Sequence, residues 1–183
     1  MVLLESPLVG PQTYPQFELN DSFGVNHTSN DIMAANGIII LFTCNHCPYA
    51  KALWKRVIND YSVMADAGFS LVAINPNINP NYPDDSPEKM QELVQSYGLP
   101  FPYLVDELQE TATNYDAVCT PDLFVLDTTM QLLYRGAYDN NWKDESSVSE
   151  RYLINVITTS IEQGFVTAKQ PSMGCSIKWV KSN

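Results

Sequence analysis

The chain has 183 residues, of which 45% are hydrophobic and 17% charged, and its formal net charge is -11. This length fits one domain with a buried core. The acidic balance argues against the Lys/Arg-rich surfaces that bind nucleic acid or anionic membranes. The longest apolar run, residues 38–42, is much shorter than the ~18 residues of a membrane-spanning helix. We therefore expect a soluble globular protein without nucleic-acid or membrane partners.

The N-terminus has neither a basic segment nor a long apolar stretch, so it does not have the pattern of a secretory signal. The chain has four cysteines, which are too few for a disulfide scaffold at this length. Both observations favour a reducing compartment, the cytoplasm. A periplasmic protein whose signal has been removed would have the same features, so that alternative stays open.

The first half of the chain predicts a strand, a helix and a second strand. Residues 1–36 are rich in Pro, Asn, Asp and Ser, and residues 17–26 suggest a hairpin. The β-branched run 37–42 predicts a central strand buried on both faces. An amphipathic helix that ends near Gly68 follows. Residues 69–74 are predicted to form the second strand.

The second half continues this alternation. A proline-rich loop is expected at 75–85, after which Ser86 and Pro87 begin a helix that ends at Gly98. A strand is expected at 102–106, a helix at 107–118, and the two strands of a hairpin at 122–127 and 131–136. Ser147 and Glu150 predict the capped start of a last helix, with Leu153, Ile157 and Ile161 on its buried face and Gly164 beyond its end. The C-terminal tail, 165–183, is expected to be irregular. The order implies parallel strands with right-handed crossovers, plus an antiparallel hairpin. We predict a single α/β domain, 1–183, with a mixed sheet between helices.

Two cysteines stand where the central strand gives way to the first long helix. Cys44 and Cys47 have the spacing at which two sulfurs can close a small ring at a helix start. Because N–H groups and the helix dipole stabilise a thiolate there, Cys44 is the predicted nucleophile, with a lowered pKa. Cys47, expected one turn into the helix, is predicted to resolve a mixed disulfide formed at Cys44.

The neighbours of this pair are predicted to tune it. His46 can place a partly positive imidazole beside the first thiolate, and Pro48 fixes φ within the first helical turn. Thr43 and Asn45 are the other residues predicted to support the active site. The preceding strand holds no acidic residue, so proton transfer must come from elsewhere, such as His46 or water.

Two other interpretations of the pair stay open. A metal half-site would need further His or Cys ligands. The candidates are Cys119, Cys175, His27 and His46. They are scattered and provide no second CxxC or HxxxH spacing, so we expect no metal. The other alternative is a pair of inert core cysteines, although a strand-to-helix junction is where reactive thiols occur.

With these motifs, the chain resembles the thioredoxin-like superfamily. It is most similar to the redoxin group allied to the alkyl-hydroperoxide-reductase/thiol-specific-antioxidant (AhpC/TSA) family, and to a bacterial subgroup of uncharacterised proteins within it. The matching stretches are "FTCNHCPYA", "YPDDSPEKM", "FPYLVDELQE", "CTPDLFVLD", "LLYRGAYDN" and "PSMGCSIKW". The resemblance implies a three-layer α/β sandwich, with Cys44 attacking and Cys47 resolving. It also implies that Pro121 is a cis-proline that exposes the backbone of Thr120 to a substrate chain; a trans proline at the strand entry is the alternative.

The chain departs from its relatives at positions that matter for function. The tryptophan before the first thioredoxin cysteine is Thr43 here, and the buried thioredoxin acid is Ile38. A role as a general reductant is therefore not implied. The peroxiredoxin motif PxxxTxxC precedes neither Cys44 nor Cys47, so a fast peroxidase is not expected. Arg135 is interpreted as structural rather than peroxide-activating.

The leading hypothesis is a thiol–disulfide oxidoreductase that acts on a protein or small disulfide. A reductase or glutathione would supply electrons, and no cofactor is expected because nucleotide-binding motifs are absent. One alternative is a thiol peroxidase with Cys44 as the peroxidatic residue; another is a redox-regulated binding protein whose 75–85 loop contacts a partner. Cys119, just before the proline, or Cys175, in the tail, is a candidate third thiol that accepts the disulfide.

Overall fold

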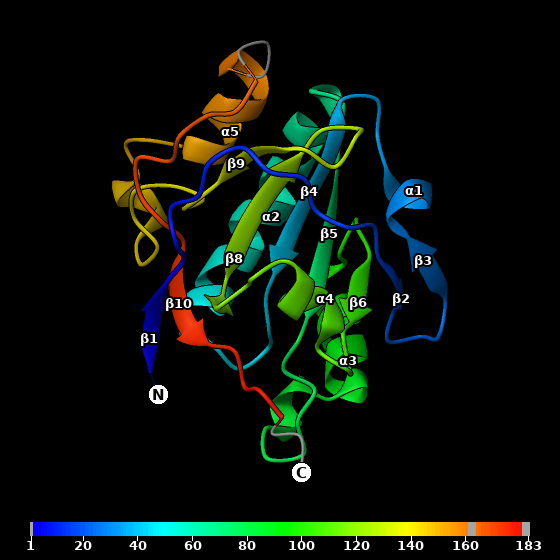
Figure 1. Ribbon diagram of the computed structural model, residues 1–183. Helices are drawn as coiled ribbons and strands as arrows, with labels where there is room; N and C mark the ends of the chain where they lie inside the picture. The colour runs from blue at the N-terminus through cyan, green and yellow to red at the C-terminus, as the bar shows by residue number, and fades with distance from the viewer. Residues whose placement is uncertain (1, 161–163, 181–183) are drawn as a thin grey trace.

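A mixed sheet forms the centre of the computed structural model, which describes residues 2–160 and 164–180 (Figure 1). Among these residues the sheet has five strands, in the order β6 (Tyr103–Val105), β5 (Phe69–Asn75), β4 (Gly37–Phe42), β8 (Asp122–Leu126) and β9 (Leu132–Arg135). Strands β4, β5 and β6 are parallel, whereas β8 runs antiparallel to both β4 and β9. The predicted mixed sheet with an antiparallel hairpin is confirmed.

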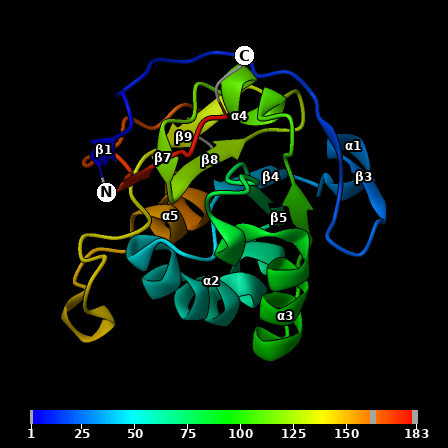
Figure 2. The ribbon, with the colours of Figure 1, turned by 90° about the horizontal axis from the view of Figure 1, so that it is seen from below.

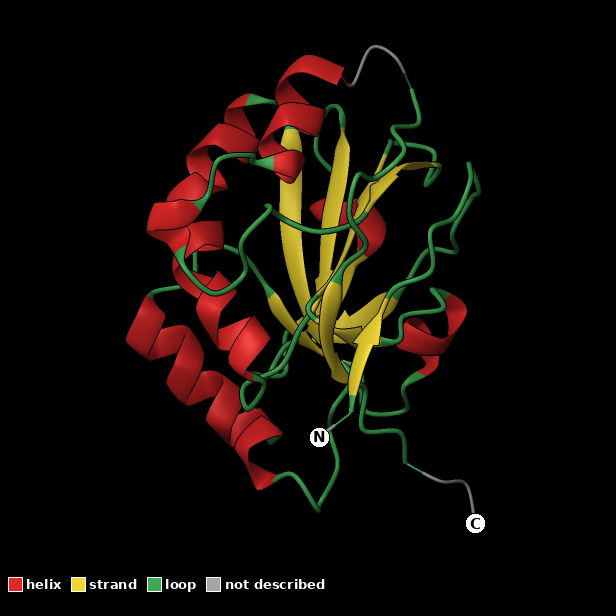
Figure 3. Cartoon of the chain, turned by 90° about the vertical axis from the view of Figure 1, so that its left-hand side faces the viewer, coloured by secondary structure: helices red, strands yellow, loops and turns green. Residues whose placement is uncertain are grey.

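Both faces of the sheet are covered, which makes three layers. Figures 2 and 3 show the long helices on one side and a shorter helix with N-terminal chain on the other. The helices are α2 (Pro48–Asp66), α3 (Pro87–Tyr97) and α5 (Tyr152–Asn155, continued by a π-helical turn, Val156–Ser160) on the first face, and α4 (Glu110–Asn114) on the second. Alternate residues of β4 enter the two apolar clusters, Ile39 on the side of α2 and Ile40 on the side of α4. This double burial explains why β4 is apolar throughout.

Local signals set the ends of the two long helices as predicted. Ser86 caps α3 by accepting a hydrogen bond from the N–H of Lys89, Pro87 occupies its first turn, and Gly98 ends it in a left-handed conformation with φ of 60°. Gly68 follows α2 with φ of 77°. Since only glycine adopts such φ values readily, these two positions fix where the helices stop.

Two helices differ from prediction. The expected helix 107–118 is only α4, because the Asp106 carboxylate accepts the N–H groups of Thr111 and Ala112 at 3.2 and 2.8 Å and so sets a later start. Ser147 does not cap the last helix. It lies in a 3₁₀ turn, Glu145–Ser147.

The last helix starts later because Asn140 holds the chain in a loop. Its side-chain oxygen accepts the N–H groups of Ser149 and Glu150, and α5 begins at Tyr152. Leu153 is buried as expected, and so is Ile157. Ile161 lies outside the described residues.

The chain termini contribute more structure than predicted. The hairpin near residues 17–26 is confirmed as β2 (Glu18–Asn20) paired with β3 (Asn26–Thr28), followed by a short helix α1 (Ser29–Ile32). The irregular tail contains a strand. Strand β10 (Met173–Ser176) lies between β1 (Leu3–Glu5) and β7 (Cys119–Thr120), antiparallel to both. None of the described helices is both long enough and apolar enough to cross a membrane.

Candidate active site

The two cysteines of the CxxC pair occupy a loop and a helix cap. Strand β4 ends at Phe42, and α2 begins at Pro48 with Cys47 as its N-cap residue. Cys44 lies three residues before this N-cap, where the strand gives way to the helix as predicted, whereas the predicted position of Cys47 one turn inside the helix is wrong. Proline at the first helical position explains this boundary, since its missing N–H costs nothing there.

An acidic residue that the sequence prediction missed holds the loop between the cysteines. Asp85, at the end of a 3₁₀ turn (Pro83–Asp85), accepts the backbone N–H groups of Asn45 at 2.7 Å and of His46 at 3.2 Å. Its second oxygen pairs with Nδ1 of His46. These N–H groups point at a carboxylate, so the loop does not continue as helix towards Cys44.

Thr120 contacts both thiols from the opposite strand. Its hydroxyl lies 3.2 Å from Sγ of Cys44, and its carbonyl oxygen lies 3.1 Å from Sγ of Cys47. The peptide bond from Thr120 to Pro121 is cis. All three contact residues are fully buried. The structure thus brings the predicted pair and the predicted proline segment together.

Of the two candidate third thiols, the structure brings only one against the pair. Sγ of Cys175 lies 2.6 Å from Sγ of Cys47. The thiol of Cys119 instead lies 3.7 Å from the Ser6 hydroxyl and 3.4 Å from the carbonyl oxygen of Pro121. Burial raises the pKa of Cys119 above its ordinary value. Cys119 is therefore a packed thiol on the far side of the proline segment.

The negative charge of the dithiol falls on the second cysteine rather than on the first. Burial, the hydrogen bond that the Cys44 thiol donates to the Cys47 sulfur, and the Asp85 carboxylate raise the pKa of Cys44 well above its ordinary value. Hydrogen bonds from the thiols of Cys44 and Cys175 and from the N–H of Ala50 lower the pKa of Cys47 to about 5, against the opposing effect of burial. The lowered pKa predicted for Cys44 is wrong, because burial and the neighbouring Cys47 sulfur and Asp85 carboxylate disfavour its thiolate.

Thr43 and Asn45, two further predicted neighbours of the pair, are held by hydrogen bonds from the sheet side of Cys44. The N–H of Thr43 continues the sheet by donating to the carbonyl of Ile74 at 2.8 Å. The hydroxyl of Tyr103 donates to the Asn45 side chain at 3.0 Å. Burial raises the pKa of Tyr103, with smaller contributions from Cys44 and Asp85. Tyr103 stays protonated and fixes the loop through Asn45.

A ring nitrogen of His46 lies within 4.8 Å of Sγ of Cys44, which is the predicted placement of the imidazole beside the first thiol. The His46 ring stacks on Tyr82 with centroids 5.3 Å apart, and its Nδ1 is engaged by Asp85. Cys44, His46 and Asp85 each offer a ligand atom within 4.8 Å of the other two, so they are the residues that could hold a metal ion in the described part of the chain. The carboxylate already accepts hydrogen bonds from the neighbouring loop, which an ion would have to displace.

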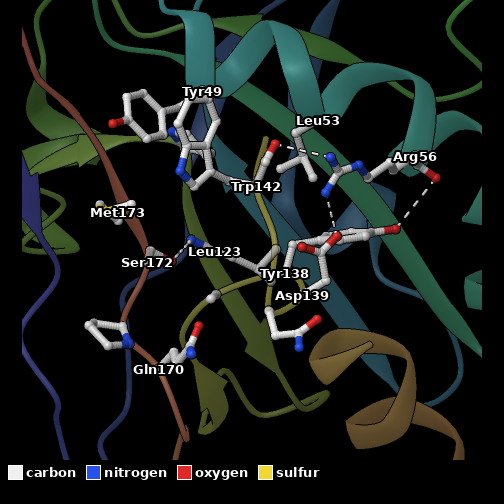
Figure 4. Close-up of a pocket in the computed structure, with 14 residues that line it drawn as sticks. Tyr49, Leu53, Arg56, Leu123, Tyr138, Asp139, Trp142, Gln170, Ser172 and Met173 are labelled. Carbon is white, nitrogen blue, oxygen red and sulfur yellow. Dashed lines mark hydrogen bonds and ion pairs between the residues drawn. The ribbon is translucent and has the colours of Figure 1, made fainter. Parts of the chain in front are cut away.

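A pocket opens between α2 and the chain that leads into β10, and among the described residues it reaches the thiol cluster only through its lining residues Tyr49 and Pro121 (Figure 4). Tyr49 packs against the thiol cluster on one side and against Trp142 on the other, with ring centroids 3.9 Å apart. Pro121, between β7 and β8, and Met173, the first residue of β10, also line the pocket. At its rim Arg56 donates to Asp139 at 2.7 Å and to the carbonyl of Trp142 at 3.0 Å.

Comparison with known proteins identifies the family. Residues 11–135 match the model of the AhpC/TSA family. The chain belongs to this family. Together with the fold described above, membership makes it a thiol-based oxidoreductase of the thioredoxin-like class, as the resemblance in its motifs suggested. A comparison with curated protein sequences gave no match.

Solved structures of similar proteins extend over the whole of this AhpC/TSA chain. An uncharacterized conserved protein from Geobacillus kaustophilus is 36% identical, with 100% of this chain and 99% of that chain covered and a TM-score of 0.89. A hypothetical protein from Sinorhizobium meliloti 1021 is 29% identical over 97% and 98% of the two chains, with a TM-score of 0.85. Peroxidoxin BcpB from Mycobacterium tuberculosis shares the fold, with 15% identity over 80% and 94% and a TM-score of 0.64.

Arg135 of this AhpC/TSA chain joins two strands. Its Nη2 donates to Asp122 and to the carbonyl of Asp116, both at 2.8 Å, and its guanidinium lies 4.5 Å from the ring centre of Phe124. Both partners of the ion pair with Asp122 are buried. These contacts agree with the structural interpretation of Arg135.

Proposed function

We propose that this chain is a thiol–disulfide oxidoreductase in which Cys44 and Cys47 cycle between dithiol and disulfide. The observation that carries the proposal is the convergence of both sulfurs on Thr120, at 3.2 and 3.1 Å, next to Pro121. A substrate chain that pairs with the backbone at this segment would bring its disulfide to the thiols. Electrons would come from a reductase or from glutathione.

The charges in the site favour one order of attack. The sequence assigns the first attack to Cys44, with Cys47 resolving. The N-cap position and lowered pKa of Cys47 support the opposite order, because the thiolate is the reactive form. Cys44 would then resolve the mixed disulfide. Asp85, within 4.8 Å of the Cys44 sulfur, is a carboxylate that could take its proton as it attacks.

The pocket between α2 and the chain that leads into β10 supports a protein substrate. Tyr49 and Trp142 give it an aromatic wall next to Pro121, which suits an apolar or aromatic side chain near the substrate's disulfide.

Turnover and trapping test the proposal together. The wild-type protein is assayed with a protein disulfide and with glutathione disulfide, and the Cys44→Ser and Cys47→Ser variants are expected to lose turnover. A mixed disulfide that accumulates on the double variant Cys44→Ser/Cys175→Ser, in which neither neighbouring thiol can displace the substrate, identifies Cys47 as the first nucleophile. Accumulation on Cys47→Ser identifies Cys44. The Cys119→Ser variant is the matched control, and full activity in both active-site variants would disprove the proposal.

Peroxidase activity is the second candidate, supported by family membership and by the lowered pKa of Cys47. Hydrogen peroxide would oxidise the Cys47 thiolate to a sulfenic acid, and a neighbouring thiol would condense with it to a disulfide and water. Peroxide-dependent consumption of NADPH, coupled through a thioredoxin system, separates this activity from disulfide exchange. The absence of PxxxTxxC argues for slow peroxide turnover.

A further inference from the structure

Three thiols form one buried cluster at the active site, and one of them comes from the C-terminal strand. Cys175 lies against Cys47 although 128 positions separate them in the sequence. Both residues and Cys44 are fully buried, in a cluster that also includes Ala50. The separation of 2.6 Å between the sulfurs of Cys47 and Cys175 approaches the ~2.05 Å of a disulfide bond. Cys47 therefore has two thiol neighbours, not one.

The fold holds Cys175 at this position through backbone pairing. Cys175 stands directly opposite Thr120 in the register of β10 with β7. A Cβ atom at Gly174 would lie 2.1 Å from the carbonyl oxygen of Thr120. Because only glycine permits this approach, the residue before Cys175 lets β10 lie close to the strand that contacts both active-site sulfurs. The contact between Cys175 and Cys47 is therefore fixed by the pairing of β10 with β7.

We propose that Cys175 is a third redox thiol, which attacks the Cys47 sulfur and forms a Cys47–Cys175 disulfide. The proposal rests on the redox use of Cys47 proposed above. The bond that breaks joins Cys47 to Cys44 or to a substrate sulfur, and the bond that forms joins Cys47 to Cys175. The departing sulfur leaves as a thiolate and receives the proton that Cys175 loses. The step exchanges one disulfide for another, so it needs no further oxidant.

The consequence is a relay of three thiols centred on Cys47. When Cys175 displaces Cys44, the Cys44 thiol is restored while the oxidised pair is held between the cap of α2 and β10. Burial and the neighbouring Cys47 sulfur raise the pKa of Cys175 to about 12, so it stays protonated until Cys47 loses its negative charge by entering a disulfide. Cys119 is excluded from the relay, because its contacts are with Ser6 and the carbonyl of Pro121.

Disulfide mapping tests the relay, and the sequence makes the map simple. The chain has no Lys or Arg before Lys51, so trypsin places Cys47 in peptide 1–51, whereas Cys175 lies in peptide 170–178. Reduced Cys44→Ala protein is treated with glutathione disulfide, its remaining thiols are alkylated, and the digest is analysed by mass spectrometry without reduction. We expect peptides 1–51 and 170–178 to be joined in most of the oxidised protein.

The controls separate this relay from other outcomes. In wild-type protein the same joined peptides are expected beside an internal disulfide in peptide 1–51, and this measurement needs no substitution. Cys119→Ala should retain the cross-link and Cys175→Ala should lose it. The proposal is overturned if Cys47 of Cys44→Ala carries glutathione, or remains a thiol, while Cys175 is alkylated. Disulfide turnover by the same wild-type sample is read separately: turnover without the cross-link would refute only the relay, and a cross-link without turnover would refute only the proposed function.

Discussion

The carboxylate of Asp85 accepts the backbone N–H of Asn45 at 2.7 Å, across 40 positions of sequence. This bond ties the turn after β5 to the loop that carries Cys44. It also brings a buried negative charge next to a buried thiol. A carboxylate in such a place both shapes the loop and raises the pKa of Cys44.

Asp85→Asn is expected to lower the pKa of Cys44, since it removes the negative charge that opposes the thiolate. It should also reduce the free energy of unfolding by roughly 1.5–3 kcal/mol, because hydrogen bonds to a charged acceptor are lost. Thiolate absorbance against pH in a Cys47→Ala background and chemical denaturation measure the two effects. Asp84→Asn, next to it and exposed, is the control. An unchanged Cys44 titration in Asp85→Asn would contradict this account.

Cys47 should titrate far below an ordinary thiol. Its folded pKa of about 5 lies under the ~8.5 of an unfolded cysteine, so thiolate absorbance of the reduced protein should persist until the pH falls to about 5. The Cys47 thiolate therefore adds to the free energy of unfolding of the reduced protein. This contribution is complete above pH ~8.5 and is lost as the pH falls towards 5. Cys44→Ala should raise the pKa of Cys47, because the Cys44 thiol is the main cause of its lowering.

Cys119→Ala serves as the control for this titration, since its thiol belongs to another contact set. A reduced wild-type protein without thiolate absorbance at neutral pH would show that Cys47 is an ordinary buried thiol. The order of attack proposed above would then revert to Cys44 first.

The sequence predicts what local patterns determine and misses what distant pairing determines. The run 37–42 identifies a strand buried on both faces, and Ser86 with Gly98 marks both ends of α3. These signals depend on neighbours a few positions away. Strand β10 has no such signal, because it forms only by pairing with β1 and β7 from the other parts of the chain. The partnership of Cys175 with Cys47 was therefore only one of two alternatives.

Asp85 shows the same limit within the site. Asp85 lies in the predicted proline-rich loop, 75–85. This loop begins at the end of β5, which is paired with β4. Side chains after adjacent parallel strands meet at one edge of a sheet, so an acid there was a candidate partner for the cysteines. Which of the neighbouring acids, Asp84 or Asp85, turns inward depends on the 3₁₀ turn. That turn leaves Asp84 exposed and Asp85 buried.

Arg135→Met should destabilise the fold by about 3–5 kcal/mol, because it leaves the buried Asp122 charge without its partner. The double variant Arg135→Met/Asp122→Leu should recover much of this loss, since no charge then remains buried alone. Chemical denaturation of the single and double variants measures both effects. Peroxide consumption per folded molecule should be unchanged in the double variant. A selective loss of peroxide consumption there, with normal stability, would assign Arg135 to peroxide chemistry instead.

Trp142→Ala should weaken the use of a protein disulfide and leave glutathione disulfide unaffected. Trp142 packs on Tyr49 at the wall of the pocket beside Pro121. An aromatic contact contributes about 0.5–1.5 kcal/mol, so KM for the protein substrate should rise by up to roughly tenfold with little change in kcat. Trp179→Ala is the matched control, because Trp179 is also partly exposed but does not line this pocket. Equal losses with both substrates would instead mean that Trp142 supports the thiols through Tyr49.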